Sequence, residues 1–396
     1  MAKVEQVKTN KFGFVEEALA QRRRDHLLRA AVPFAPEDAV RGWRGDRPLV
    51  NFSSNDYLGL SKHPRVIAAA QEMTMRYGTS ASASRLITGT LPIHQELEER
   101  LAAACGQEAA LLFNSGFQAN ATILPALLDA SSVVLCDRLV HNSMVQGMLA
   151  SGARLMRYQH NDLEHLERLL DKAAGQGYSR MLIASETVFS MDGDRSDVSA
   201  LVQLTQTYNA ILYLDDAHAL GVLGKNGVGL AAHQPGVDLV IGTFGKAFGA
   251  FGAFVACSRA VRDYLVNCCP GFIYTTALPP GVIGAISAAL ELVPSLDAER
   301  QRLHFQAEQL RQHIRQLGYD TRGSSSQIVP LVVGDEAQAL HLSHWLETQG
   351  LLASAIRPPT VPRGTARLRF ALSSQHTGEQ LQALMQAIEE WHGRAS

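Results

Sequence analysis

Residues 211–250 read ILYLDDAHALGVLGKNGVGLAAHQPGVDLVIGTFGKAFGA, and they contain two short apolar runs that each lead into polar residues. The run ILYL leads into Asp215, and the run LVIGTF is followed by Lys246. Short apolar runs of this kind are typical of buried strands, and open α/β sheets bind ligands at the carboxyl ends of their parallel strands. We therefore expect Asp215, His218 and Lys246 to lie at a ligand-binding edge of such a sheet.

The same alternation of apolar runs and longer helical patterns extends over residues 51–285. It indicates stacked βαβ units and an α/β fold with a mostly parallel, buried sheet. The predicted strands are AALLF (109–113), SVVLCD (132–137), ARLMRY (153–158), RMLIAS (180–185), ILYLDD (211–216), LVIGTF (239–244) and GAFVACS (252–258). Between two of them, Asn161 or Asp162 can cap a helix whose leucines at 163, 166, 169 and 170 share one face.

Two further zones flank this central region. Residues 1–50 are rich in arginine and show a helical pattern at residues 14–31 that is followed by Pro33 and Pro36, so they predict an N-terminal arm. Residues 286–396 combine long helical patterns with strands near QIVPLVVG and LRFAL, which predicts a smaller α+β domain. The expected organisation is an arm (1–50), a large α/β domain (51–285) and a small C-terminal domain (286–396).

The composition is that of an ordinary globular protein, with 46% apolar and 19% charged residues in a chain of 396. The net charge of −2 gives no reason to expect a nucleic acid or an anionic membrane as partner. Five cysteines without a CxxC pair argue against a disulfide framework or a structural zinc site. We expect a cytoplasmic location, no signal peptide and no membrane span, since the most apolar stretch, residues 239–258, contains Lys246 and several glycines.

Other common motifs match poorly. Gly227, Gly229 and Ala232 fit GxGxxA, but they follow DDAH in a Gly-rich segment and do not directly follow a strand. Gly245-Lys246 lacks the spacing and the Ser or Thr of a phosphate-binding P-loop, and neither GxSxG nor HExxH occurs. Two interpretations of DDAH remain: a metal site, or Asp215 beside a cationic ring nitrogen with His218 beside a phenolic oxygen.

Lys246 favours the second interpretation, because burial lowers the pKa of a lysine as a Schiff-base amine requires. Upstream, Ser115-Gly116-Phe117 follows a predicted strand and opens a helix, whose free amide groups and positive dipole end suit a phosphate. Together these features resemble the pyridoxal-phosphate enzymes of the aspartate-aminotransferase fold.

The chain is most similar to one family of that fold, the α-oxoamine synthases, through eight motifs that occur in order from residue 51 to residue 369. They are NFSSNDYLGLS (51–61), SGFQAN (115–120), DRLVHNS (137–143), ETVFSMDGD (186–194), LDDAH (214–218), TFGKAFG (243–249), FIYTTALPP (272–280) and AIRPPTVPRGTARLR (355–369). The resemblance implies the pyridoxal-phosphate-dependent transferase fold, fold type I, with a mostly parallel seven-stranded sheet in the large domain and a small α+β domain.

The resemblance also implies roles for individual residues. Lys246 would form the Schiff base with pyridoxal phosphate and move protons, with Asp215, His218 and His141 as further catalytic residues. Asp215 would pair with the ring nitrogen, His218 and Ser190 would contact the ring oxygen, and His141 would stack on the ring. The phosphate would be held by Gly116, Phe117 and Thr243, and by Thr275 or Thr276 of the other subunit of a homodimer. The implied substrate contacts are Arg369 for the amino-acid carboxylate, and Arg29, Asn55, Arg357 and Thr360.

The implied reaction joins an amino acid to an acyl-CoA, or to an acyl-carrier-protein thioester, with loss of CO₂. Within the family the chain looks most like the branch that serves biotin biosynthesis, which uses L-alanine and a pimeloyl thioester. The segment GTSASASRLITGT (78–90) departs from the more Gly-rich versions of the family, so a sister enzyme that uses glycine or serine stays open. A transaminase is a further alternative, whereas a non-catalytic partner subunit would lack Lys246.

Overall fold

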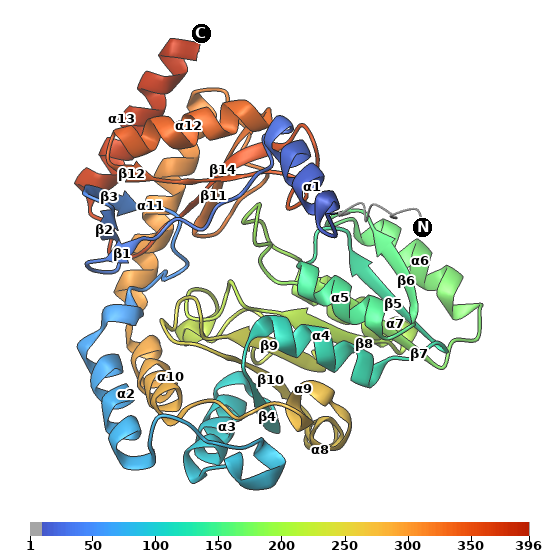
Figure 1. Cartoon of the computed structure of the whole chain (residues 1–396). Helices are drawn as coiled ribbons and strands as arrows, with labels where there is room; N and C mark the ends of the chain where they lie inside the picture. The colour runs from blue at the N-terminus through green and yellow to red at the C-terminus, as the bar shows by residue number, and fades with distance from the viewer. Residues whose placement is uncertain (1–9, 396) are drawn as a thin grey trace, which may run out of the picture.

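The computed structural model describes residues 10–395, so the first nine residues of the predicted arm and Ser396 lie outside the described part. Figure 1 shows a large sheet with its helices and, above it, a smaller part that contains the C-terminal elements. The predicted division at residues 285/286 falls within the helix α10 (Pro280–Leu292) and stays a prediction.

All seven predicted strands of the large region are present, and they form one sheet. The order across the sheet is β4-β10-β9-β8-β7-β5-β6, and every neighbouring pair is parallel except the two that involve β10. The predicted mostly parallel seven-stranded sheet is therefore confirmed. Its strands are β4 (Ala109–Phe113), β5 (Ser132–Asp137), β6 (Arg154–Tyr158), β7 (Arg180–Glu186), β8 (Ile211–Asp215), β9 (Leu239–Thr243) and β10 (Ala253–Cys257).

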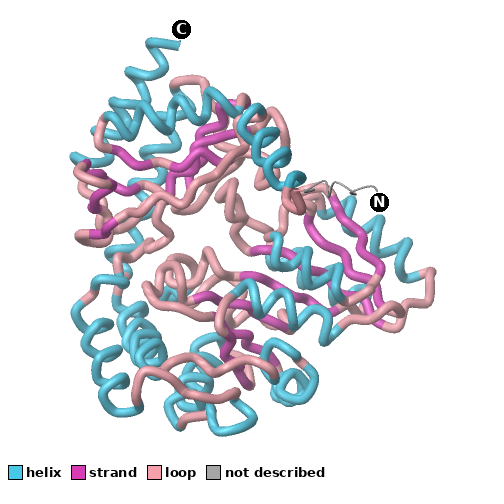
Figure 2. The backbone as a smooth tube through the Cα atoms, viewed as in Figure 1, coloured by secondary structure: helices cyan, strands magenta, loops and turns pink. Residues whose placement is uncertain are grey.

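Helices cover both faces of this sheet, because the strand residues alternate between two apolar clusters. Leu111 and Phe113 pack on one side, whereas Ala110 and Leu112 pack on the other. The first cluster includes residues of α4 (Gly116–Leu127), α5 (Asn142–Ala150), α8 (Arg259–Cys268) and α9 (Pro270–Ile273). The second includes residues of α2 (Pro64–Tyr77), α3 (Pro92–Cys105), α6 (Leu163–Ala174), α7 (Val198–Tyr208) and α10. Figure 2 shows these helices around the strands.

The smaller part contains two short sheets. One is antiparallel, in the order β11-β14-β13, with β11 (Ile328–Gly334), β13 (Ser354–Ile356) and β14 (Ala366–Ala371). The other joins β1 (Ala35–Pro36), β2 (Arg41–Arg44) and β3 (Arg47–Asn51) to β12 (Leu351–Leu352). The helices of this part are α11 (Asp297–Gln316), α12 (Glu336–Thr348) and α13 (Gly378–Ala395), and the short helical turns of the chain are Leu60–Lys62, Arg85–Gly89, Lys225–Gly227 and Val293–Ser295.

The N-terminal helix differs from its prediction. The pattern at residues 14–31 predicts one long helix, but α1 spans Gly13–Arg24 and buries none of its residues. His26 takes a left-handed backbone conformation with φ of 55°, so the helix cannot continue beyond it. Among the described residues no single helix is long and apolar enough to cross a membrane. Residues 280–316, which contain α10 and α11, reach that length and apolarity only when the two helices are taken together, and the angle between the helices is 77°.

Candidate active site

A cavity of about 270 Å³ lies between the carboxyl end of the large sheet and the strands β13 and β14. It contains six of the predicted site residues. They are Asn55, His141, Ser190, His218, Lys246 and Arg369, together with Ser53, Met191, Ser354 and Ile356. The cavity is therefore where the sequence predicted ligand chemistry, at the edge to which the parallel strands point.

Lys246 follows β9 by three residues and enters this cavity. Burial lowers the pKa of its amine to about 8, against the opposing effect of the carboxylates of Asp215 and Glu186. Arg369 adds to the lowering. At neutral pH a far larger fraction of this amine is therefore neutral than in an ordinary lysine, and the neutral form is the one that acts as nucleophile and base.

Asp215 is the last residue of β8 and is buried. Its carboxylate accepts hydrogen bonds from the amide of Ala217 (3.0 Å) and from Nδ2 of Asn120 (2.8 Å). Asn120 is in turn fixed, because its Oδ1 accepts from the hydroxyl of Tyr213 at 2.7 Å. These bonds hold the carboxylate of Asp215 in one orientation.

Glu186 is a site residue that the sequence reasoning missed. It ends β7, is the register partner of Asp215, and is buried with one carboxyl oxygen that has no hydrogen-bond partner. Burial raises the pKa of Glu186 well above its usual range, and the neighbouring charge of Asp215 adds to the rise. The protonated form of Glu186 is therefore favoured far more than in an exposed glutamate. Its place at a strand end within ETVFSMDGD is the signal that could have identified it.

Two histidines approach the cavity from different elements. His218 is buried, and its Nδ1 lies 2.7 Å from the hydroxyl of Tyr57, which the sequence reasoning also missed. Burial, assisted by Lys246, lowers the pKa of His218 well below its usual value, so the ring is neutral. His141 caps α5, where its Nδ1 accepts from the amide of Ser143 at 3.2 Å and lies 2.7 Å from the Ser143 hydroxyl.

Arg369 reaches the cavity from β14 of the smaller part. Its Nε donates to the carbonyl of Ser190 at 2.5 Å, and its Nη1 donates to Oδ1 of Asn55 at 3.2 Å. The guanidinium is buried, yet neither bond neutralises its charge. A buried cation without an anionic partner in these bonds favours a carboxylate ligand.

The turn from β4 into α4 forms a second feature of the candidate site. Ser115 caps α4, and the amides of Gly116 and Phe117 stand in the first helical turn, where no helical carbonyl can accept from them. A Cβ on Gly116 would lie 2.5 Å from Cγ2 of Thr243, and the buried Oγ1 of Thr243 has no hydrogen-bond partner. This turn thus offers unpaired hydrogen-bond donors, as a phosphate site needs. A side chain at position 116 would not fit beside Thr243.

Five other predicted residues do not line the cavity: Arg29, Thr275, Thr276, Arg357 and Thr360. Thr275 accepts from Nδ2 of Asn114 at 3.0 Å, and the carbonyl of Thr276 accepts from the same amide. Arg29 donates to Oγ1 of Thr360 at 3.2 Å and to the carbonyl of Arg357 at 3.5 Å. The structure therefore brings Arg29, Arg357 and Thr360 together, outside the residues that line the cavity.

The metal interpretation of DDAH is disfavoured by the donors that already occupy its carboxylates. Asp216 accepts from the hydroxyl of Thr187 and from the amides of Leu230 and Ala231 at 3.2 Å, so it fixes the Gly-rich loop. In that loop Gly229 has φ of +99°, and a Cβ there would lie 1.8 Å from Oδ2 of Asp216. The residues that match GxGxxA therefore belong to a loop that is held by Asp216, and we assign them no dinucleotide-binding role.

These features fit pyridoxal phosphate. The lysine of lowered pKa suits its aldehyde, Asp215 suits its ring nitrogen, and the unpaired Thr243 hydroxyl with the Gly116 turn suits its phosphate. The fold and the site together define a pyridoxal-phosphate-dependent enzyme of fold type I.

Comparisons with known proteins agree. The sequence model of "Aminotransferase class I and II" matches residues 47–388. The 8-amino-7-oxononanoate synthase of Gluconacetobacter diazotrophicus is 51% identical over 384 residues, which cover 95% of this chain and 96% of that protein. A serine palmitoyltransferase structure with a PLP internal aldimine has a TM-score of 0.90 at 27% identity and covers 97% of this chain and 98% of the other. The 8-amino-7-oxononanoate synthase of Francisella tularensis has a TM-score of 0.76 at 28% identity and covers 88% and 98%.

The chain belongs to the class I and II aminotransferase family and, within it, to the α-oxoamine synthases. The predicted family, fold and cofactor are confirmed.

Proposed function

We propose that this enzyme joins L-alanine to a pimeloyl thioester and releases 8-amino-7-oxononanoate, CO₂ and CoA, the reaction of an 8-amino-7-oxononanoate synthase in biotin biosynthesis. The observation that carries the proposal is the 51% identity over nearly the whole of both chains to a relative of that name. The same proposal places the enzyme in the cytoplasm, which suits five cysteines that are all free.

When bound, pyridoxal phosphate supplies an electron sink for negative charge that develops at the amino-acid Cα. Asp215 would keep a proton on its ring nitrogen, while His218 and Ser190 would contact the ring oxygen and His141 the ring face. Gly116, Phe117 and Thr243 would hold the phosphate, with Thr275 or Thr276 contributed by the other subunit of a homodimer.

The substrate steps follow from the positions of Lys246 and Arg369. The Arg369 guanidinium binds the carboxylate of L-alanine, and the Lys246 amine removes the proton from Cα. A bond then forms between Cα and the acyl carbon as the thioester C–S bond breaks, and the CoA sulfur takes up a proton on release. The bond from Cα to the carboxylate breaks with loss of CO₂, and Lys246 returns a proton to Cα. Arg29, Asn55, Arg357 and Thr360 would contact the substrates.

A second candidate is a sister enzyme that condenses serine or glycine with another acyl thioester. It is favoured by the higher TM-score to serine palmitoyltransferase, 0.90 against 0.76. The sequence identities favour the first proposal, because 51% to an 8-amino-7-oxononanoate synthase far exceeds 27% to the palmitoyltransferase.

Titration of the purified, cofactor-loaded protein with L-alanine, glycine and L-serine tests the amino-acid half of the proposal. The absorbance of the bound cofactor should change at the lowest concentration with L-alanine, and D-alanine serves as the stereochemical control. A response confined to serine or glycine would favour the sister enzyme.

A further inference from the structure

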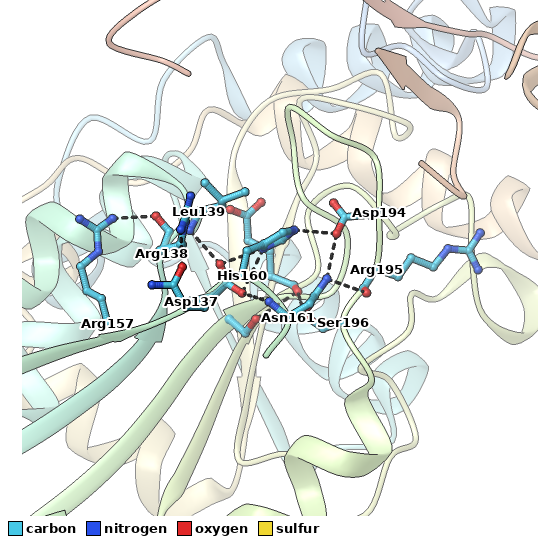
Figure 3. Close-up of polar contacts among 12 residues, drawn as sticks. Asp137, Arg138, Leu139, Arg157, His160, Asn161, Asp194, Arg195 and Ser196 are labelled. Atoms are coloured by element: carbon cyan, nitrogen blue, oxygen red, sulfur yellow. Dashed lines mark hydrogen bonds and ion pairs between the residues drawn. The ribbon is translucent and has the colours of Figure 1, made fainter. Parts of the chain in front are cut away.

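His160 lies outside the cavity, between two carboxylates that come from different segments (Figure 3). Its Nδ1 is 3.0 Å from Oδ1 of Asp137, the last residue of β5, and its Nε2 is 2.7 Å from Oδ2 of Asp194. Both carboxylates are buried, and His160 itself is partly buried. No role was predicted for this histidine from the sequence.

The geometry implies that the His160 ring carries two protons. Ionised carboxylates only accept hydrogen bonds, so each ring nitrogen must donate to its neighbour. Burial lowers the pKa of His160, but the hydrogen bonds and charges of Asp137 and Asp194 outweigh burial and raise the pKa to about 9. His160 is therefore a cation that neutralises two buried anions near neutral pH.

A metal ion is the alternative occupant, since ligand atoms of His160, Asp192 and Asp194 lie within 4.8 Å of one another. Asp192 is already paired with the guanidinium of Arg367, however, and both ring nitrogens of His160 already face carboxylates. The proton-carrying ring explains this arrangement without a metal.

Asp194 belongs to a tight loop, residues 187–196, that follows β7 and carries Ser190. The amide of Phe189 donates to the carbonyl of Asp194 at 3.0 Å, which closes the loop across Ser190. The ring of Phe189 packs edge-on against the His160 ring, with centroids 4.4 Å apart. His160 thus contacts both residues whose backbones pair at the base of the Ser190 turn.

The tip of the same loop is held from the opposite side. The carbonyl of Ser190 accepts from Arg369, and the carbonyl of Gly193 accepts from the hydroxyl of Ser326 at 2.8 Å. Ser190 is therefore positioned between two supports, the smaller part of the molecule and the His160 pair at the end of the large sheet.

We propose that His160 is a positioning residue: by bridging Asp137 and Asp194 it fixes the 187–196 loop, so that the Ser190 side chain meets the cofactor. This inference rests on the proposed contact of Ser190 with the cofactor, and it is independent of which acyl thioester the enzyme uses. The charged groups around the bridge are Asp137, Asp192, Asp194, Arg138, Arg157, Arg195 and Arg367.

The first test measures the dissociation constant of pyridoxal phosphate, by absorbance titration of cofactor-free protein, in wild type and in His160→Gln. Glutamine carries both of its N–H donors on one nitrogen and has no positive charge, so it cannot replace donors at the two opposite ring nitrogens of His160. Affinity should therefore fall roughly ten- to a hundredfold, the range for partners that orient the ligands of a bound group. His165→Gln is the matched control, because His165 only accepts one backbone amide at 3.1 Å nearby. Ser190→Ala is measured alongside.

The outcomes separate the claims. A loss in both His160→Gln and Ser190→Ala, with His165→Gln unchanged, supports the proposal. A loss in Ser190→Ala alone overturns the role of His160 and leaves the Ser190 contact intact. No loss in Ser190→Ala contradicts the Ser190 contact and the proposal with it. A fall in the melting temperature of His160→Gln with an unchanged dissociation constant shows a purely structural residue and overturns the proposal.

A second test uses pH and does not need the glutamine variant to fold. In wild type the pyridoxal phosphate dissociation constant should rise as pH passes about 9, where His160 loses its proton. His160→Lys keeps a cation with several donors to a higher pH, so its curve should rise later. Lys246 titrates in both proteins and contributes equally to both curves. The difference between the wild-type and His160→Lys curves therefore reports the titration of the side chain at position 160. Coincident curves would overturn the proposal.

Discussion

At the residue scale, the proposed reaction assigns to Lys246 both the link to the cofactor and the two proton transfers at the amino-acid Cα. Replacing it in Lys246→Ala should abolish the visible absorbance of lysine-linked cofactor and lower turnover by at least roughly 10²- to 10⁴-fold, the contribution of a positioned proton-transfer group alone. Lys225→Ala is the control, because Lys225 is exposed on the Gly-rich loop. An absorption spectrum measures the first effect and a CoA-release assay measures the second. A Lys246→Ala protein that kept both the absorbance band and the turnover would refute the assigned role of Lys246.

The lowered pKa of Lys246 has its own consequence. Only the neutral amine attacks the cofactor aldehyde, and burial brings the pKa of this lysine down from 10.5 to about 8. The rate of pyridoxal phosphate uptake by cofactor-free protein should therefore rise as pH increases through about 8 and level off above it. Stopped-flow absorbance between pH 6.5 and 10 measures this. A rate that keeps rising through pH 10 would show an ordinary exposed lysine.

Individual site residues could be found from the sequence where a motif coincides with a strand end. Asp215 ends β8, and His218 and Lys246, each three residues beyond a strand, line the cavity. Glu186, Asn120 and Tyr57 were missed, although each stands in a quoted motif. Asn120 and Tyr57 matter because they contact Asp215 and His218, which are at least 95 residues away in the sequence. Glu186 matters because it pairs with Asp215 on the neighbouring strand.

At the element scale, the β4–α4 turn makes a sharp prediction. In Gly116→Ala the added methyl meets Cγ2 of Thr243 at 2.5 Å, so the turn and the phosphate site must shift. Affinity for pyridoxal phosphate should fall about 10- to 100-fold, since a displacement near 1 Å can have effects of that size.

Thr243→Ser supplies the control for this prediction, because serine keeps the hydroxyl and removes the colliding methyl. The double variant Gly116→Ala with Thr243→Ser should therefore recover most of the lost affinity in the same absorbance titration. Equal losses in the single and double variants would show that the collision is not the cause.

The elements themselves were predictable where their signals are local. Seven apolar runs became seven strands, and Asp162 caps α6 by accepting from the amide of His165, with Leu166 and Leu170 buried. The sheet of β1, β2, β3 and β12 was not predicted, since β3 and β12 are about 300 residues apart in the chain. The early end of α1 depends on one left-handed residue, His26, for which residue periodicity gives no signal.

At the scale of the whole molecule, large apolar side chains remain exposed near Thr275 and Thr276. Tyr274 is 83% exposed and Ile87 76%, and their segments are joined by a bridge between Ser84 and Thr276. Exposed apolar patches of this kind mark interaction surfaces. The location supports the proposed homodimer, in which these loops would lie at the other subunit's phosphate site.

Tyr274→Asp should therefore shift the protein from dimer to monomer in sedimentation velocity and weaken pyridoxal phosphate binding together with it. Phe305→Asp is the control, because Phe305 is 64% exposed on α11 of the smaller part. A wild-type protein that sediments as a monomer at micromolar concentration would contradict the shared site.

The most direct measurement of the proposed reaction is kcat/KM for CoA release with L-alanine, glycine and L-serine, each paired with pimeloyl-, acetyl- and long-chain acyl-CoA. Lys246→Ala provides the background rate. The account predicts the highest kcat/KM for L-alanine with pimeloyl-CoA, with an α-amino ketone and CO₂ formed in equal amounts. A higher value for serine or glycine with another thioester would contradict it and identify a sister α-oxoamine synthase.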